Sequence, residues 1–189
     1  MSGPLQKHSN TLRSKPPLLL TESQSEFDDL EARFRKEILP RGIVEQIYFD
    51  DIIASVWEIL RLRRCKTAIV NIAFKKALHA LLDAQLEDYY GRAKDLSKRW
   101  FNDPAARTEV VEILGELKLD ESAIEAEAMR ISSASLEGVD RMLAAAESRR
   151  SRAFRNIEDC RASFAKTIRT VSDRALQQAT EPLTLQPQE

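Results

Sequence analysis

Basic side chains gather at two points of the sequence, where they could bind phosphate groups. One cluster consists of Arg61, Arg63, Arg64 and Lys66, and the other consists of Arg149, Arg150, Arg152 and Arg155. If either cluster forms a phosphate-contacting surface, we expect it to bind nucleic acid without reading the base sequence, and more weakly as salt rises. The alternative interpretation is that acidic side chains of the same chain neutralise both clusters, because blocks of opposite charge can pair within one fold.

The distribution of charge keeps both interpretations open. Residues 21–60 carry ten acidic and four basic side chains, whereas residues 61–80 carry six basic side chains and no acidic one. The formal net charge of the whole chain is only −1, so no overall excess of positive charge singles out a polyanionic partner. Internal ion pairs and hydrated helix faces are therefore the simpler explanation of the two clusters.

Other residues that could take part in catalysis or redox chemistry do not belong to a larger motif. His79 lies within a helical pattern and could act as a general base, but a histidine satisfied by local contacts is the simpler interpretation. Asp50 and Asp51 are adjacent and could work as acid and base, although hydrated helix carboxylates also explain the pair. Cys65 and Cys160 could form a redox switch if the helices bring them together, and the default is a pair of reduced thiols.

The sequence lacks the motifs that mark nucleotide-binding enzymes and metalloproteins. The five glycines are isolated, so there is neither a P-loop nor a dinucleotide fingerprint. Neither histidine follows a glutamate by three residues, and cysteine and histidine do not cluster, which argues against di-iron and zinc sites. We therefore expect a non-enzymatic protein without a cofactor, a metal or a small-molecule substrate.

No segment predicts export or membrane insertion. The apolar Leu18–Leu20 is too short for the core of a signal peptide and follows Pro16 and Pro17. Every longer apolar stretch is interrupted by charge, so we expect no membrane span. The two cysteines lie far apart and form no disulfide framework. The sequence therefore predicts a soluble, cytoplasmic protein without a membrane partner.

Long helices must position the residues described so far. A charged fraction of 31%, with five glycines and 6% aromatic residues, favours long hydrated helices over a sheet. Residues 43–101 contain no proline and a single glycine, Gly91, and their apolar positions recur at helical spacing. This run predicts either one very long helix or two helices that break at Gly91. A second run of helical pattern extends from Leu136 to about Ala179 and is its only partner of comparable length.

Shorter helices are expected around this pair. Ser23 and Glu26 have the spacing of a capping box, which predicts a helix that starts there and ends before Pro40. Asp103 stands directly before a proline, an arrangement typical of a helix start, and a second short acidic helix opens near Asp120.

The apolar residues of the two long helices form stripes that need more than one neighbour. The stripe of the first consists of Ile47, Ile53, Val56, Trp57, Leu60, Ala68, Ile72, Leu78 and Leu82, widened by Phe49, Ile52, Ile59, Ile69, Val70 and Phe74. After a turn at residues 132–135, the last helix carries a heptad seam of Leu136, Val139, Leu143, Ala146, Arg150, Ala153, Ile157, Cys160 and Phe164, continued after a shift by Ile168, Val171 and Ala175. Because Arg150 lies on this seam, we expect it to pair with a carboxylate, such as that of Asp50, Asp51 or Glu58.

These elements predict an all-α protein. We expect an elongated antiparallel hairpin of two long helices with coiled-coil packing, a short N-terminal helix, and two short acidic helices. Residues 1–20 predict a flexible basic arm, residues 21–180 a single helical domain, and residues 181–189 a disordered tail.

Several short strings resemble a widespread bacterial helical family without an assigned activity. These strings are Asn10-Thr11-Leu12-Arg13, Leu18-Leu19-Leu20, the acidic helix start at Glu22 to Phe27, Trp57 with Leu60-Arg61-Leu62-Arg63-Arg64, Asp140-Arg141-Met142-Leu143 and Phe154-Arg155-Asn156-Ile157. The chain departs from the family where Ala144–Ala146 replace an Arg-Tyr-Glu string, and where the His-Gly of the arm is missing. The resemblance implies an all-α, cytoplasmic bacterial protein and transfers no catalytic residue.

The function that the sequence favours is protein interaction. We expect exposed helix faces to bind another protein or a second copy of the chain. Sequence-independent binding of nucleic acid through the arginine clusters and the basic arm is the alternative.

Overall fold

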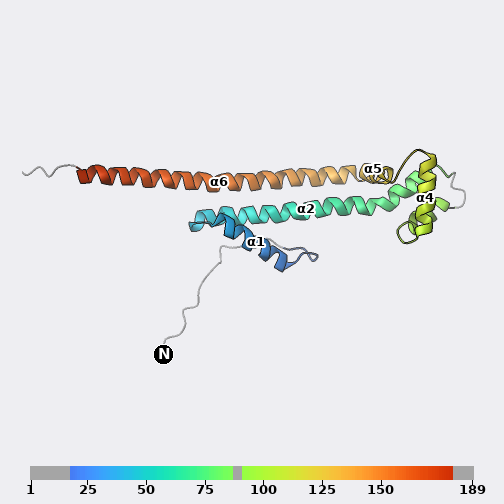
Figure 1. Ribbon diagram of the computed structural model, residues 1–189, viewed down its shortest axis with the longest axis horizontal. Coiled ribbons are helices and arrows are strands. Elements are labelled where there is room, and N and C mark those ends of the chain that lie inside the picture. The colour runs from blue at the N-terminus through green and yellow to red at the C-terminus, as the bar shows by residue number, and fades with distance from the viewer. Residues whose placement is uncertain (1–17, 87–90, 181–189) are drawn as a thin grey trace, which may run out of the picture. The chain divides into compact units, whose positions relative to one another are not determined.

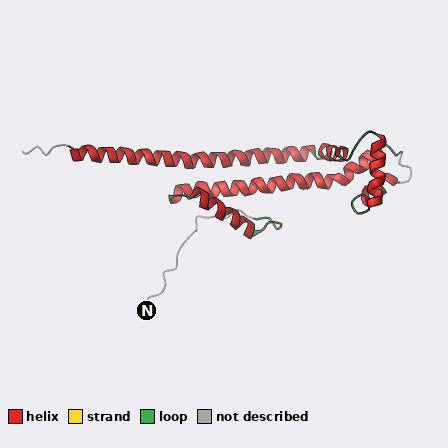
Figure 2. Cartoon of the chain, in the orientation of Figure 1, coloured by secondary structure: helices red, strands yellow, loops and turns green. Residues whose placement is uncertain are grey.

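The computed structural model describes residues 18–86 and 91–180, in which helices are joined by loops and no strand occurs (Figures 1 and 2). The helices are α1 (Gln24–Ile38), α2 (Gly42–Asp83), α3 (Arg92–Arg99), α4 (Pro104–Glu116), α5 (Ser122–Ile131) and α6 (Ser133–Thr180). The predicted all-α class is confirmed. Residues 1–17 of the predicted arm and the predicted tail, residues 181–189, lie outside the described residues.

The chain divides into two compact units, and each long helix contributes to both. The first unit contains the chain up to Trp57 together with the part that begins at Glu147. The second unit contains everything between, Glu58–Ala146. Each unit has its own apolar clusters, which are described separately below.

In the first unit, α1 packs on the start of α2 because both present an apolar stripe. The side chain of Ser23 caps α1 by accepting a hydrogen bond from the backbone N–H of Glu26 at 3.4 Å. Phe27 of α1 is buried against Trp57 of α2, with ring centroids 5.4 Å apart in an edge-on arrangement. The helix ends at Ile38 as predicted, and the left-handed φ of 48° at Leu39 turns the chain toward α2.

The two long helices pack against each other in this unit. Ile52 of α2 is buried in one cluster with Ala153 and Ile157 of α6. The side chain of Glu45, seven residues earlier in α2, pairs with Arg161, which comes later in α6. Residue numbers therefore rise along one helix as they fall along the other, and the packing is antiparallel.

The core of the second unit joins four helices. The end of α2 contributes Leu78 and Leu82, which are fully buried. Around them lie Ala93 and Leu96 of α3, Ala106, Val110 and Leu114 of α4, and Ile124 and Ala128 of α5. The N-cap of α4 is Asp103, whose carboxylate accepts a hydrogen bond from the N–H of Ala105 at 2.9 Å, with Pro104 in the first turn. Both predicted short helices are confirmed.

A second cluster in this unit pairs the long helices again. Ile59 and Leu62 of α2 are buried with Val139 and Ala146 of α6. The four side chains lie on one face of each helix because the apolar positions of both segments recur at three and four residues. The predicted antiparallel pairing of two long helices thus holds within each unit.

The predicted division of the long run into two helices is confirmed, with α2 ending eight residues before Gly91, and an unbroken helix over residues 43–101 is wrong. α2 ends at Asp83, and α3 begins at Arg92, directly after Gly91. Gly91 has a φ of +71°, a left-handed conformation that a glycine adopts without strain and other residues adopt at a cost. The break allows the apolar face of α3 to join the core of the second unit.

Two details of the predicted pattern differ from the structure. The predicted buried stripe of α2 includes Ile47, Leu60, Ala68 and Ile72, but all four are exposed, Ile47 and Ile72 to 53% and 80%. At these positions no neighbouring helix of the described chain covers the apolar stripe of α2. The turn predicted at residues 132–135 is shorter, because Ser132 alone separates α5 from α6 and its carbonyl already accepts the N–H of Leu136.

Candidate functional site

The first predicted basic cluster lies in the second unit and is partly engaged by the chain itself. The ammonium group of Lys66 forms an ion pair with Asp140 of α6 at 2.7 Å. Arg61 is half-buried, whereas Arg63 and Arg64 are exposed, and all three arginines have interactions within the chain. For Lys66, the interpretation as an internal ion pair is therefore the one that the structure supports.

The second predicted cluster lies in the first unit, on α6. Arg149, Arg152 and Arg155 are exposed, and Arg149 has an interaction within the chain. Arg150 is half-buried, in keeping with its place on the seam. A carboxylate partner for Arg150, and phosphate binding by either cluster, remain predictions.

The isolated candidates are divided between the two units. Cys65 and Cys160 are free, half-buried thiols that belong to different units. Asp50 accepts a hydrogen bond from the side-chain amide of Gln46 at 2.7 Å. The pKa of Asp51 is raised, first by desolvation and then by the negative charge of Asp50. A raised carboxyl pKa alone does not make a catalytic pair, since the two groups are neighbours on a helix surface.

An apolar groove lies in the first unit between the start of α2 and the later part of α6. We call it the α2–α6 groove, and it has a volume of about 730 Å³. Its lining includes Arg41, Val44, Cys160, Phe164, Ile168 and Arg169. The lining combines apolar side chains with arginines, and this combination suits an amphipathic ligand.

One edge of this groove is built around Arg161. Its guanidinium donates to the carboxylate of Glu45 at 2.8 Å and to the backbone carbonyl of Ile38 at 2.7 Å. The same carboxylate accepts the backbone N–H of Arg41 at 2.8 Å. These hydrogen bonds from Arg161 and Arg41 hold the pKa of Glu45 below its usual range. Arg161 therefore ties the end of α1 and the start of α2 to α6.

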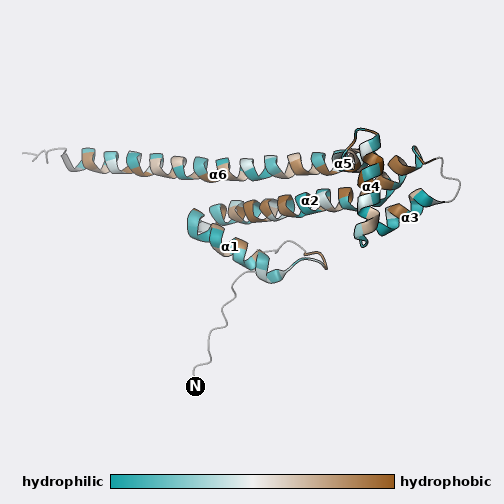
Figure 3. Cartoon of the chain, turned by 45° about the vertical axis from the view of Figure 1, so that its right-hand side comes forward, coloured by the Kyte–Doolittle hydropathy of each residue, from teal (hydrophilic) through white to brown (hydrophobic). Residues whose placement is uncertain are grey.

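Beyond this edge the apolar face of α6 continues without cover from the described part of the chain. Residues 161–178 are all exposed, and Phe164, Ile168 and Val171 have exposed fractions of 65%, 51% and 59%. They extend the seam in which Ala153 and Ile157 are buried. Figure 3 shows that hydrophobic positions recur along α6 into its last turns. Contiguous exposed apolar side chains of this kind typically mark an interaction surface.

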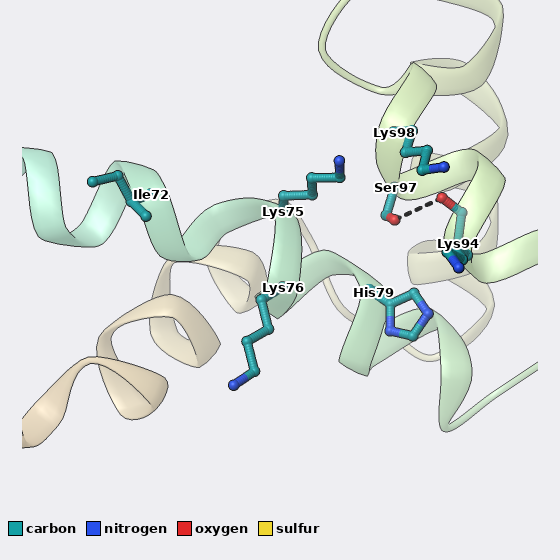
Figure 4. Close-up of a pocket in the computed structure, with 7 residues that line it drawn as sticks. All are labelled: Ile72, Lys75, Lys76, His79, Lys94, Ser97 and Lys98. Carbon is teal, nitrogen blue, oxygen red and sulfur yellow. Dashed lines mark hydrogen bonds between the residues drawn. The ribbon is translucent and has the colours of Figure 1, made fainter.

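A second groove lies in the second unit between α2 and α3, and its lining is strongly basic (Figure 4). We call it the lysine groove, and it has a volume of about 560 Å³. It is lined by Lys75, Lys76 and His79 of α2, Lys94, Ser97 and Lys98 of α3, and the exposed side chain of Ile72. Lys75 extends from α2 toward α3, while Lys76 points away from α3 (Figure 4).

Neither groove was predicted from the sequence. For the lysine groove a signal was present, because residues 61–80 have six basic and no acidic side chains, and Lys94 and Lys98 are one helical turn apart. This signal does not predict a groove, because the lysines come together only where α3 packs against the end of α2. For Arg161, the neighbouring Cys160 was assigned to the seam, and no local pattern indicates that an arginine next to it reaches Glu45.

Within residues 18–86 and 91–180, no helix is both long and apolar enough to span a membrane. Over the same residues, no group of three or more histidine, cysteine, aspartate or glutamate side chains has a metal-binding arrangement.

No protein-family model, curated protein or solved structure matches the chain. The resemblance to a bacterial helical family therefore stays a prediction.

Proposed function

We propose that the protein is a non-enzymatic interaction protein whose α2–α6 groove binds an acidic amphipathic helix of another protein. The observation that carries this proposal is the exposed continuation of the α6 seam at Phe164, Ile168 and Val171. An apolar heptad face normally packs against another helix, because water contact along it is unfavourable.

The shape of the surface supports a helix as its occupant. Within the first unit, Ile52 of α2 covers the α6 seam at Ala153 and Ile157. Where α2 starts, the cover ends, and the exposed Val44 faces the groove together with Phe164. A third helix laid in this groove would continue an interface that already exists, with anchors spaced at three and four residues.

The charge of the surface supports an acidic partner over a second copy. Residues 161–180 carry four basic side chains and one acidic one, and Arg41 adds a positive charge at the groove. Two copies packed face to face along α6 would bring these like charges together, which costs free energy. Glutamate or aspartate beside the apolar anchors of a partner helix would instead face arginines.

Binding of designed helical peptides tests the proposal. The probe is a labelled peptide of three heptads, about 21 residues, with leucine at the core positions and glutamate at the flanking ones. Its counterpart has lysine in place of glutamate. We expect the acidic peptide to bind and the basic one to bind at least tenfold more weakly, because the arginines repel it.

Two double variants place the binding on the groove. F164S/I168S should weaken binding of the acidic peptide by about tenfold or more, because the apolar anchors are lost. V111S/M129S is the matched control, since these side chains are exposed to 48% and 52% but lie in the second unit. Circular dichroism verifies that both variants remain helical. Equal affinity of wild type and F164S/I168S refutes the proposal.

Two rival occupants are decided by separate measurements on the full chain. If sedimentation shows that the wild type is a dimer and F164S/I168S is a monomer, the surface binds a second copy, and the proposal of a partner helix is wrong. If the protein binds vesicles of anionic phospholipid through Phe164 and does not bind the acidic peptide, the surface binds a membrane, and the proposal is also wrong.

The same proposal places the protein in the cytoplasm. The two free cysteines support this location, because a reducing compartment keeps unpaired thiols reduced.

A further inference from the structure

We infer that the lysine groove between α2 and α3 binds the phosphate backbone of a single-stranded nucleic acid. The inference is independent of the α2–α6 groove, since it concerns other residues in the other unit. It also differs from binding through the arginine clusters, because none of their residues lines this groove.

The cations stand on both walls of the groove. Lys75 and Lys76 belong to α2, and Lys94 and Lys98 belong to α3. All four are exposed, and none of the described side chains that line the groove is a carboxylate. The nearest acid along α3, Asp95, is paired with Arg99 at 3.2 Å. Such a concentration of positive charge repels itself, so a bound polyanion would relieve the repulsion.

The spacing of the lysines matches a chain of phosphates. Lys94 and Lys98 are four residues apart on one helix, which separates the bases of their side chains by about 6 Å. This distance is comparable with that between neighbouring phosphates of an extended single strand. Lysine acts as a flexible point charge, so the groove can follow a backbone without fixing one phosphate in a unique geometry.

The remaining lining suits bases rather than phosphates. Ile72 presents an apolar side chain that is 80% exposed, and the half-buried ring of His79 lines the groove two helical turns further along α2. Bases gain free energy by packing on aromatic and apolar side chains whatever their identity. An inorganic phosphate chain would leave both side chains unused, and therefore the observations favour a nucleic acid.

The experiment measures binding of fluorescent oligothymidylate, about ten nucleotides long, to the full chain over a range of salt. With three phosphate contacts, from Lys75, Lys94 and Lys98, the affinity should fall about 18-fold between about 50 mM and about 200 mM salt. In K94Q/K98Q two of these contacts are removed, so the fall should shrink to about threefold and the low-salt affinity should drop about tenfold or more. K94R/K98R keeps both charges and should bind like wild type.

Matched variants decide where the strand binds. K36Q/K166Q makes the same change of charge at exposed lysines of the first unit and should leave affinity unchanged. R63Q/R64Q tests the arginine cluster and should retain binding. Wild type that does not bind, K94Q/K98Q that binds like wild type, or a loss confined to R63Q/R64Q overturns the inference. Polyphosphate of the same charge that binds as tightly as oligothymidylate overturns the assignment to nucleic acid.

Discussion

The guanidinium of Arg161 in α6 donates a hydrogen bond of 2.8 Å to the buried carboxylate of Glu45 in α2. The same guanidinium donates to the backbone carbonyl of Ile38. Ile38 is the last residue of α1, and the carbonyls of the last helical turn receive no hydrogen bond from within the helix. The side chain of Arg161 thus connects α6 to the end of α1 and to the start of α2. It also lines the α2–α6 groove together with Phe164. If the α2–α6 groove is a binding site, its shape depends on this pair.

The first prediction concerns the stability that Arg161 contributes. Arg161→Ala should lower the free energy of unfolding by about 1–3 kcal/mol, because the carboxylate of Glu45 stays buried without its charged donor. Urea denaturation followed by circular dichroism measures the change. Arg141→Ala, which removes an exposed pair with Glu137 on one helix, is the control and should have almost no effect. Equal effects of the two substitutions would contradict the assigned role.

The second prediction is a dependence on pH. The pKa of Glu45 is lowered in the folded protein, mainly by the hydrogen bond from Arg161. Its contribution is therefore fully present above the ordinary glutamate pKa of about 4.3 and is lost as pH falls through the lowered value. Wild type should be more stable than Glu45→Gln at neutral pH, and the difference should shrink in acid. A difference in unfolding free energy that stays constant down to about pH 3 would contradict this.

The third prediction compares two side chains of α2 that the sequence pattern treats alike. Leu78 is fully buried in the second unit, whereas Ile72 is 80% exposed. Leu78→Ala should cost about 2–5 kcal/mol, since it leaves a cavity among four helices. Ile72→Ala should change stability by less than about 0.5 kcal/mol. Similar losses in chemical denaturation would show that the assigned burial is wrong.

The fourth prediction sets two glycines against each other. An added Cβ meets no atom within 4 Å at Gly91 or at Gly115, so neither substitution causes a clash. Gly91→Ala should destabilise the protein by about 1 kcal/mol, because its φ is +71°. Gly115→Ala lies within α4 and should stabilise it by up to about 1 kcal/mol through helix propensity. Thermal unfolding of both variants should therefore shift in opposite directions.

Local patterns were enough to predict much of the fold. The cap at Ser23, the cap at Asp103 and the start of α3 after Gly91 all follow from preferences of single residues for a few backbone conformations. The helical class and the two long helices follow from apolar spacing, which depends only on the period of the helix. The paired burial of Ile52 and Ile157 was within reach because both lie on such stripes.

The tertiary structure alone decided which parts of each stripe find a neighbour. Phe164 and Ile157 have the same pattern in the sequence, yet only Ile157 is covered, because the cover by α2 ends where that helix starts. Likewise Lys75 and Lys98 line one groove only because α3 packs against the end of α2. Spacing along one helix reports which side chains share a face. Contact between faces depends on where other helices begin and end, and this information is spread over the whole chain.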